Sequence, residues 1–281
     1  MRPVAIIEPA TLSTLRPIAA LRRLPQFGDL LWTLATHRLK VRYKQSRLGI
    51  AWAVIQPLTM MAVFTLVFTM LGRMPGSSDV PYPLFAYAAL VPWVAFSTGL
   101  SSAVGSLTGH ASLLTKVYFP REILPMTYVF VALVDLGLAS LALAGLMIWY
   151  EVPIAATAVW AITAVMLLAA FTMALSLLLS AVQVRHRDVS LAMPMVLQVW
   201  MFASPVIYPL SAVRKALPDW LYAVYLLNPM ASVVDTFRSA LVLRQGPDWQ
   251  ALGAGVLVTC VLLPCAYLYF KLCERTMADA V

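Results

Sequence analysis

The residue types that perform chemistry are scarce in this chain, and the usual motifs for nucleotide or metal chemistry are missing. No Gly-x-x-x-x-Gly-Lys-[Ser/Thr] motif occurs, and no Gly-Lys pair occurs anywhere, so the chain lacks the loop that cradles nucleotide phosphates. The three histidines, His37, His110 and His186, are far apart, and no metal-ligand spacing such as His-Glu-x-x-His is present. We therefore predict no catalytic residue, no metal site and no cofactor on this chain.

Asp135 stands out because it falls near the middle of a long apolar stretch, residues 123–149. An acidic group at that depth in a membrane costs about 2.5–3.5 kcal/mol on insertion scales, so it needs a partner or a proton. Three interpretations are open: a proton or ion site, a structural hydrogen bond to a neighbouring helix, or a helix that begins later and leaves the carboxyl less deep. Because no second charge within the apolar stretches could form a relay with it, we favour the structural role.

The composition indicates which elements position these residues. Of the 281 residues, 62% are apolar and only 11% are charged, and the mean hydropathy is +0.84. Soluble domains are about a quarter charged. The chain is therefore predicted to be a polytopic membrane protein built from α-helices.

Six apolar stretches are each near the twenty residues that a helix needs to cross the hydrocarbon of a bilayer. They lie at about residues 50–71, 82–105, 123–149, 154–182, 191–209 and 250–271. Ahead of them, residues 27–49 form an amphipathic pattern, with apolar residues on one side and Lys40, Lys44 and Arg47 on another. We predict that this helix lies in the headgroup region. The predicted fold is an all-α polytopic membrane protein with six transmembrane helices.

Charge predicts the orientation of these helices. With a cytoplasmic N-terminus, fifteen Lys and Arg residues fall on the cytoplasmic side and five on the outer side. Cytoplasmic segments of membrane proteins carry such an excess of basic residues. Both terminal tails, residues 1–26 and 273–281, are therefore predicted to be cytoplasmic, as is the connection at residues 110–125.

The outer segment 211–245 contains two helix candidates that are too short to cross a bilayer. The first begins at Pro218-Asp219-Trp220, and the second at Asn228-Pro229, an N-cap followed by proline at the first helical position. On the second helix, Asp235 and Arg238 are three residues apart and could pair. We favour a re-entrant hairpin that dips in from the outer face, the alternative being two helices lying flat on the outer leaflet.

The connection at residues 110–125 can form a short helix of two or three turns that Pro120 ends. Leu113, Leu114 and Val117 share one face, and Arg121 and Glu122 follow at the start of the next stretch. Such a helix between two membrane helices could pass motion between a soluble partner and the membrane. The alternative is an ordinary tight loop on the membrane surface.

Three segments carry a resemblance to a known family. Segment 41–57, Val-Arg-Tyr-Lys-Gln-Ser-Arg-Leu-Gly-Ile-Ala-Trp-Ala-Val-Ile-Gln-Pro, resembles the entry to the first span in ABC-2-type permeases of polysaccharide exporters. Lys-Val-Tyr-Phe-Pro-Arg-Glu-Ile-Leu-Pro at 116–125 and Leu-Asn-Pro-Met at 227–230 are similar to the same family. With the six-span layout, the resemblance covers nearly the whole chain. The first two segments look closer to the O-antigen and teichoic acid branch than to the capsule branch.

The resemblance implies a homodimeric permease with two cytoplasmic ATPase subunits on separate chains, which would bind ATP and Mg. Residues 110–120 would be the coupling helix that docks on the ATPase, and residues 27–47 would make a peripheral contact. The coupling residues would be Leu113, Leu114, Lys116, Tyr118, Phe119, Pro120, Arg121 and Glu122. Leu114, Tyr118 and Phe119 would be apolar anchors, and Lys116, Arg121 and Glu122 polar contacts.

The substrate that the resemblance implies is a polyprenyl-diphosphate-linked glycan moving from the cytoplasmic to the outer side. A diphosphate that enters from the inner leaflet needs cations at the interface, and guanidinium groups bind phosphate bidentately. Candidates beside the first span are Arg38, Arg42, Lys44 and Arg47. Binding of inner-leaflet lipids is an equal interpretation of these residues, worth about 1 kcal/mol per cation near an anionic surface.

A glycan also needs a path of low friction, which aromatic faces can provide. The candidates for such a path are Phe64, Phe68, Trp93, Phe96, Trp200 and Tyr208. For any single one of them, core packing or a place in the aromatic belt at the membrane interface is the stronger interpretation. The outer hairpin would form a gate on the outer side, and the candidate residues for this gate are Trp220, Asn228, Pro229, Asp235 and Arg238.

We therefore predict the permease subunit of an ABC exporter in a bacterial inner membrane, with one permease domain at residues 50–272. Membrane lipids are expected partners and nucleic acid is not. One alternative within the same fold is an exporter of a drug, a lipid or another small amphiphile. Another, of a different class, is a proton- or ion-coupled transporter that uses Asp135.

Overall fold

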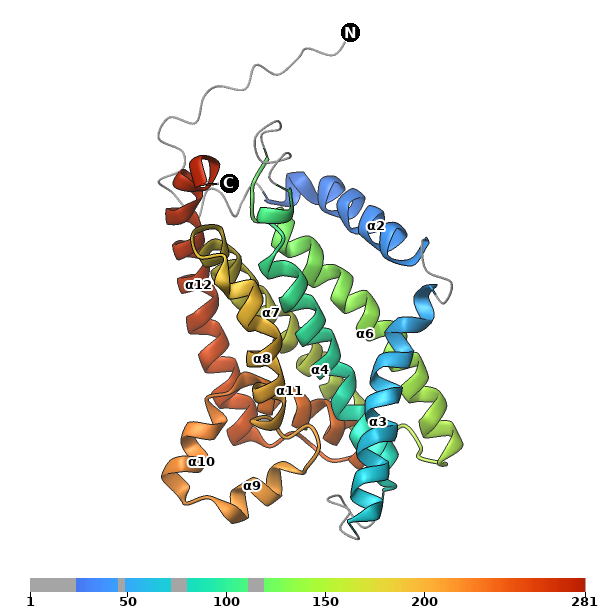
Figure 1. Ribbon diagram of the computed structural model, residues 1–281. Coiled ribbons are helices and arrows are strands. Elements are labelled where there is room, and N and C mark those ends of the chain that lie inside the picture. The colour runs from blue at the N-terminus through green and yellow to red at the C-terminus, as the bar shows by residue number, and fades with distance from the viewer. Residues whose placement is uncertain (1–23, 45–48, 72–79, 111–118, 281) are drawn as a thin grey trace.

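The computed structural model describes residues 24–44, 49–71, 80–110 and 119–280, and all regular structure in these ranges is helical. Figure 1 shows a bundle of long helices with short helices at one end. The main elements are α2 (Gly28–Lys44), α3 (Trp52–Met70), α4 (Tyr82–Val104), α6 (Ile123–Trp149), α7 (Val159–Arg185), α8 (Asp188–Phe202), α9 (Leu210–Ala216), α10 (Asp219–Leu226), α11 (Pro229–Arg238) and α12 (Trp249–Ala280). The prediction of an all-α membrane fold is confirmed.

Among the described residues, five helical segments are long and apolar enough to cross a membrane. They are Gly49–Met70, Tyr82–Val104, Ile123–Trp149, Ala156–Arg185 and Trp249–Glu274. They correspond to the predicted spans one to four and six. Each matches a stretch in which apolar residues follow one another with few charges, which is the strongest of the sequence signals for a membrane helix.

The predicted fifth span, residues 191–209, does not form one long helix. Helix α8 has 15 residues and ends at Phe202, so it is about 22 Å long, which is shorter than the roughly 30 Å hydrocarbon core. The chain then continues without regular helix to Pro209. Pro205 accounts for the early end, because proline donates no backbone N–H and its ring clashes with the carbonyl four residues before it.

Helix α4 occupies the middle of the bundle, and most of its side chains are buried. It packs against α3, α6, α7 and α11, with α6 as its most extensive neighbour. Gly99 permits the close crossing of α4 and α6, because a Cβ atom there would lie 2.7 Å from the Cβ of Ala132. Without a side chain at residue 99 the two backbones can approach, as small residues commonly allow in membrane bundles.

Helix α11 is short, yet it is enclosed by α4, α7 and α12, and all of its residues except Asp235 are buried. Its predicted N-terminus is confirmed: the side chain of Asn228 accepts a hydrogen bond from the Met230 N–H, and Pro229 follows the cap. Helices α9 and α10 lie together at one end of the bundle, and Trp220 on α10 is 68% exposed.

Helix α2 lies across the opposite end of the bundle from α9 and α10 and packs along the first half of α6 (Figure 1). The C-terminal end of α12 lies at the same end as α2. Helix α2 covers residues 28–44 of the amphipathic helix predicted at 27–49, and residues 45–48 lie outside the described residues. Asp29 lies in the first turn of α2, and Arg42 and Lys44 lie in its last turn. The acidic residue at the start of α2 and the two basic residues at its end suit the helix dipole.

Candidate functional site

The helices α2, α4 and α6 enclose a cavity of about 260 Å³ near the end of the bundle that α2 covers. It is lined by Arg38, Val41 and Arg42 from α2, Thr98, Gly99 and Ser102 from α4, and Tyr128, Val131 and Ala132 from α6. The lining from α4 and α6 combines small and apolar residues with the hydroxyl side chains of Thr98, Ser102 and Tyr128, and α2 contributes two cations. Two of the four predicted phosphate-binding cations, Arg38 and Arg42, therefore line one cavity.

The guanidinium of Arg38 lies 4.9 Å from the ring centroid of Tyr128, in cation–π contact. Its Nη2 atom is also 3.3 Å from Nδ1 of His110. That Nδ1 lies 2.7 Å from the carbonyl oxygen of Ser106, which can only accept, so we assign the proton to Nδ1. A protonated Nδ1 cannot accept from Arg38. Among the described residues no carboxylate neutralises Arg38, so its charge is available to an anion.

Burial lowers the pKa of His110, and the positive charge of Arg38 lowers it further, while the hydrogen bond to the Ser106 carbonyl opposes the shift. The imidazole is therefore neutral at physiological pH. A neutral His110 supports the side of the cavity without adding a third charge.

Arg42 reaches the carboxylate of Asp135 on α6, with Nη1 2.7 Å from Oδ2. The hydroxyl of Tyr43 donates a second, short hydrogen bond to the same carboxylate. Burial, followed by this bond to Asp135, raises the pKa of Tyr43, so the phenol keeps its proton and acts as a donor. Asp135 is thus held by two side chains of α2, an arrangement that fits the structural role favoured from the sequence.

Arg42 borders two spaces at once. Its side chain is 43% exposed, against 9% for Asp135, and it lines both the basic cavity and a smaller cavity that leads to Asp135 between α3, α4 and α6. Helix α2 therefore closes the basic cavity and carries both of its cations. Of the other two predicted cations, Lys44 lies at the exposed end of α2, and Arg47 falls outside the described residues.

The coupling residues predicted in 110–122 fall into two groups. Leu113, Leu114, Lys116 and Tyr118 lie outside the described residues. Phe119 is buried in an apolar cluster with Leu107, Ile123, Tyr267 and Phe270. Glu122 is 1% exposed, and Lys271 Nζ of α12 lies 2.8 Å from its carboxylate.

Arg121 is also tied to α12, because its Nη1 donates to the backbone carbonyl of Glu274 at 2.6 Å. In this conformation Phe119, Arg121 and Glu122 contact α12, which is not the outward contact with an ATPase that the resemblance implied for them. Sequence reasoning missed Lys271 as the partner of Glu122, since it lies 149 residues away and resembles an ordinary cation at the end of a helix.

The predicted glycan-path residues are not brought into one exposed surface. Phe64 and Phe68 pack inward against α4, with the Phe68 and Tyr82 ring centroids 5.3 Å apart. Trp93 and Phe96 are buried in the core. Phe96 stacks on Phe171 and meets the edge of Trp200 at 5.3 Å. In this structure, these four phenylalanine and tryptophan side chains of α3 and α4 pack within the bundle, which agrees with the packing interpretation of each one.

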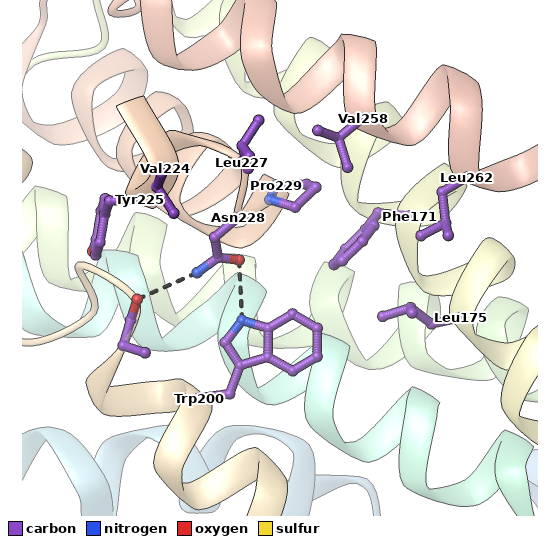
Figure 2. Close-up of a pocket in the computed structure, with 11 residues that line it drawn as sticks. Phe171, Leu175, Trp200, Val224, Tyr225, Leu227, Asn228, Pro229, Val258 and Leu262 are labelled. Atoms are coloured by element: carbon purple, nitrogen blue, oxygen red, sulfur yellow. Dashed lines mark hydrogen bonds between the residues drawn. The ribbon is translucent and has the colours of Figure 1, made fainter. Parts of the chain in front are cut away.

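Trp200 also forms a wall of a second, mostly apolar cavity of about 460 Å³, shown in Figure 2. It lies between α7, α8 and α12, and the end of α10 and its link to α11 also line it. The indole Nε1 donates to the Asn228 Oδ1 at 3.0 Å, and the Asn228 amide donates to the Ala203 carbonyl at 3.3 Å (Figure 2). Asn228 therefore caps α11 and also joins it to the end of α8.

Arg238 makes the second link between α11 and the segment after α8. Its side chain is fully buried, and it pairs with Asp235 at 3.4 Å as predicted. Its Nη1 donates to the carbonyl of Pro205 at 3.0 Å, and the guanidinium lies 4.0 Å from the ring centroid of Phe85. Tyr208 joins the same region through a hydrogen bond from its hydroxyl to the Phe202 carbonyl at 2.7 Å.

Comparison with known proteins places the chain among transporters. The family described as "ABC-2 type transporter" matches residues 29–242. The chain is 32% identical to the O-antigen export system permease protein RfbA of Myxococcus xanthus, over 94% of this chain and 100% of that one. It is 24% identical to the protein of the same name from Klebsiella pneumoniae, over 75% and 79% of the two chains. It is also 24% identical to the polysialic acid transport protein KpsM of Escherichia coli, over 80% and 87%.

Proposed function

The chain belongs to the ABC-2 type transporter family, and from that premise we propose that it is the permease subunit of an ATP-driven exporter of a polyprenyl-diphosphate-linked polysaccharide. The observation that carries the substrate class is the basic cavity between α2, α4 and α6. Similarity to permeases named for O-antigen export supports the same class. The glycan would cross a bacterial inner membrane from the cytoplasmic to the outer side.

The proposed headgroup site uses Arg38 and Arg42, with Lys44 and Arg47 as further cations at the interface. Guanidinium groups form charge-assisted, bidentate hydrogen bonds with phosphate oxygens. The placement of the site supports this role, because α2 lies across the end of the bundle while the apolar faces of the bundle helices remain exposed. A diphosphate could enter at α2 while its polyprenyl chain stays in the bilayer.

We propose six crossings, the fifth formed by α8 together with residues 203–209. Helix α8 runs from the α2 end of the bundle toward α9 and α10, as a crossing would (Figure 1). In this topology both termini and α2 are cytoplasmic, and α10 and α11 form a re-entrant hairpin from the outer side. The burial of α11 among α4, α7 and α12 supports the hairpin, because a helix lying on the outer leaflet would expose one face.

The working complex would be a homodimer of this chain with two ATPase subunits that bind ATP and Mg. Helices α3 and α8 expose apolar side chains that the bilayer or a second copy can cover; these include Val63, Leu66, Val67 and Met70 on α3, and Leu191, Met195 and Val199 on α8. The ATPase would dock at the connection between α4 and α6, which includes residues 110–120. The chain itself acts as a transport subunit, as the permeases to which it is similar are named.

The headgroup site is tested by binding. The full chain in lipid nanodiscs is titrated with a polyprenyl diphosphate that carries a short sugar, and Arg38→Gln and Arg42→Gln are compared with Lys40→Gln. Lys40 is an exposed cation of α2 that does not line the cavity, so it controls for the general charge of the helix. Each lost charge-assisted contact is worth about 1.5–3 kcal/mol, so affinity should fall about ten- to a hundredfold in the two Arg variants.

The affinity of the Lys40→Gln control for the polyprenyl diphosphate should be within about twofold of wild type, since an exposed cation contributes little more than general attraction. Equal losses in all three variants would assign the effect to general attraction between a basic helix and an anionic lipid. Unchanged affinity in Arg38→Gln and Arg42→Gln would remove the cavity as the headgroup site.

A further inference from the structure

We propose that α12 is a lever that carries motion from the start of α6, at the cytoplasmic end, to the short buried helix α11 near the outer side. This inference rests on the proposed function, because it requires an ATPase that moves the connection between α4 and α6. The proposal adds α12 to α4 and α6, the two helices that this connection joins directly. The structure supports it through one firm contact at each end of α12.

The cytoplasmic contact is a cluster of four charged residues, Arg121, Glu122, Lys271 and Glu274. Lys271 Nζ lies 2.8 Å from the Glu122 carboxylate and 2.9 Å from Glu274 Oε2. Arg121 donates to the Glu274 carbonyl at 2.6 Å. Because Glu122 is buried, its charge is satisfied only while Lys271 stays in place, and separating the two would leave a buried carboxylate unpaired.

Apolar packing reinforces this charged cluster. Phe119 and Ile123, on either side of the charges, belong to the same buried cluster as Tyr267 and Phe270 of α12. Elsewhere α12 packs along α7 and α11 rather than along α6. The start of α6 is therefore coupled to α12 at this place, so a displacement of residues 119–122 acts directly on the end of α12.

The contact near the outer side is the crossing of α12 with α11. A Cβ atom on Gly255 would lie 2.8 Å from the Cβ of Ser232, so the two helices are in close contact at a glycine, with no room for a side chain or for a closer approach. Packed helices of this kind move together or switch between discrete arrangements, because close-packed interfaces deform little. The two contacts of α12 are 16 residues apart, which is about 24 Å of helix.

A movement of α11 would be passed on to the end of α8 and to the residues that follow it. Asn228, at the start of α11, holds Trp200 and the carbonyl of Ala203, and Arg238, at its end, holds the carbonyl of Pro205. Helix α11 is therefore fixed to the outer end of α8 at both of its own ends. A displacement of α12 would reposition α11 and the end of α8 as one unit, next to the apolar cavity of Figure 2.

The test compares the complex of the full chain and its ATPase in nanodiscs with and without a non-hydrolysable ATP analogue. Hydrogen exchange is followed in peptides from α10 and α11. The test variant carries both Glu122→Gln and Lys271→Gln, which removes the ion pair without leaving one charge unpaired. Arg187→Gln, which removes an exposed cation at the turn between α7 and α8, is the matched control.

In wild type and in the control, the nucleotide should change the exchange of α11. In the double variant, the nucleotide-dependent change in the hydrogen exchange of α11 should be at least about fivefold smaller, while ATP hydrolysis continues. Fivefold is the lower end of the effects that coupled sites commonly have on one another. An equal response of α11 in the double variant would overturn the lever. So would a wild-type complex that exports glycan with no nucleotide response in α11, and in that case the proposed function would stand. A wild-type complex that neither hydrolyses ATP nor exports would contradict both.

Discussion

Asp135 is an acid within an apolar helix whose carboxylate is paired with side chains of another helix. Its carboxylate accepts from Arg42 and Tyr43, two neighbours on α2, so it fastens that helix to α6. The sequence pointed to a structural partner for Asp135 but not to α2 as its source. No local pattern could identify that source, because Arg42 and Tyr43 precede the first span while Asp135 lies two spans later.

Asp135→Asn should loosen α2 from α6. An amide can still accept a hydrogen bond from Tyr43, but the ion pair is lost, and a partly exposed pair of this kind is worth about 1 kcal/mol. We expect faster hydrogen exchange in α2 and a modest fall in the melting temperature, with export reduced rather than abolished. Abolished export with α2 exchanging as in wild type would instead support a proton-coupled transporter.

His110 predicts a pH dependence of stability. Its pKa in the folded protein is lowered by burial, so at mildly acidic pH the unfolded chain binds more protons than the folded one. Stability must then rise with pH across the interval between the lowered pKa and the ordinary value near 6.5. Acidification through that interval should lower the melting temperature of the wild-type protein in detergent.

The control for this prediction is His110→Gln, which keeps a hydrogen-bond donor but cannot be protonated. Its melting temperature should fall less over the same interval. Parallel curves for the two proteins would show that other groups produce the pH dependence.

At the scale of single elements, glycine residues permit the closest approach of one helix backbone to another. Gly99 allows α4 and α6 to cross, and both helices line the basic cavity at this crossing. Gly99→Ala should destabilise the fold by about 1–3 kcal/mol through overpacking against Ala132. The measurement is thermal unfolding of the purified protein.

Gly137→Ala on α6 is the matched control, because nothing lies within 4 Å of the added Cβ. It should be neutral or slightly stabilising, since alanine favours a helix over glycine by up to about 1 kcal/mol. Equal losses in the two variants would mean that the crossing of α4 and α6 is not tight.

The elements that could be predicted from the sequence are those whose signal is local. Long apolar stretches predicted six spans, five of which correspond to helices long and apolar enough to cross a membrane, and Asn228-Pro229 predicted the start of α11. The fifth span was predicted too long because a count of apolar residues does not show that the chain after Phe202 leaves the helix to meet Arg238. Local patterns contain no information on such distant partners.

The same limit applies to the candidate site. Arg38 and Arg42 could be proposed from charge beside an apolar stretch, but Tyr128 and the shape of the cavity depend on how α2 folds back over α4 and α6. Glu122 looked like an exposed contact because it follows a proline at the mouth of a span. Its burial depends on Lys271 at the other end of the sequence.

At the scale of the whole molecule, the described residues are organised along one axis. A basic cavity under α2 and the charged cluster of α6 and α12 lie at one end, and α9, α10 and the link to α11 lie at the other (Figure 1). The family and the relatives agree with transport along such an axis.

The most direct test is therefore reconstitution with the glycan itself. Inside-out vesicles are prepared with the full chain, its ATPase and a polyprenyl-diphosphate-linked polysaccharide, and the glycan is probed with an external glycosidase after ATP is added. ATP should move glycan into the protected lumen, and Arg38→Gln with Arg42→Gln should prevent this. Glycan that stays fully digestible with ATP present, in vesicles that accumulate a small amphiphilic dye, would contradict polysaccharide export.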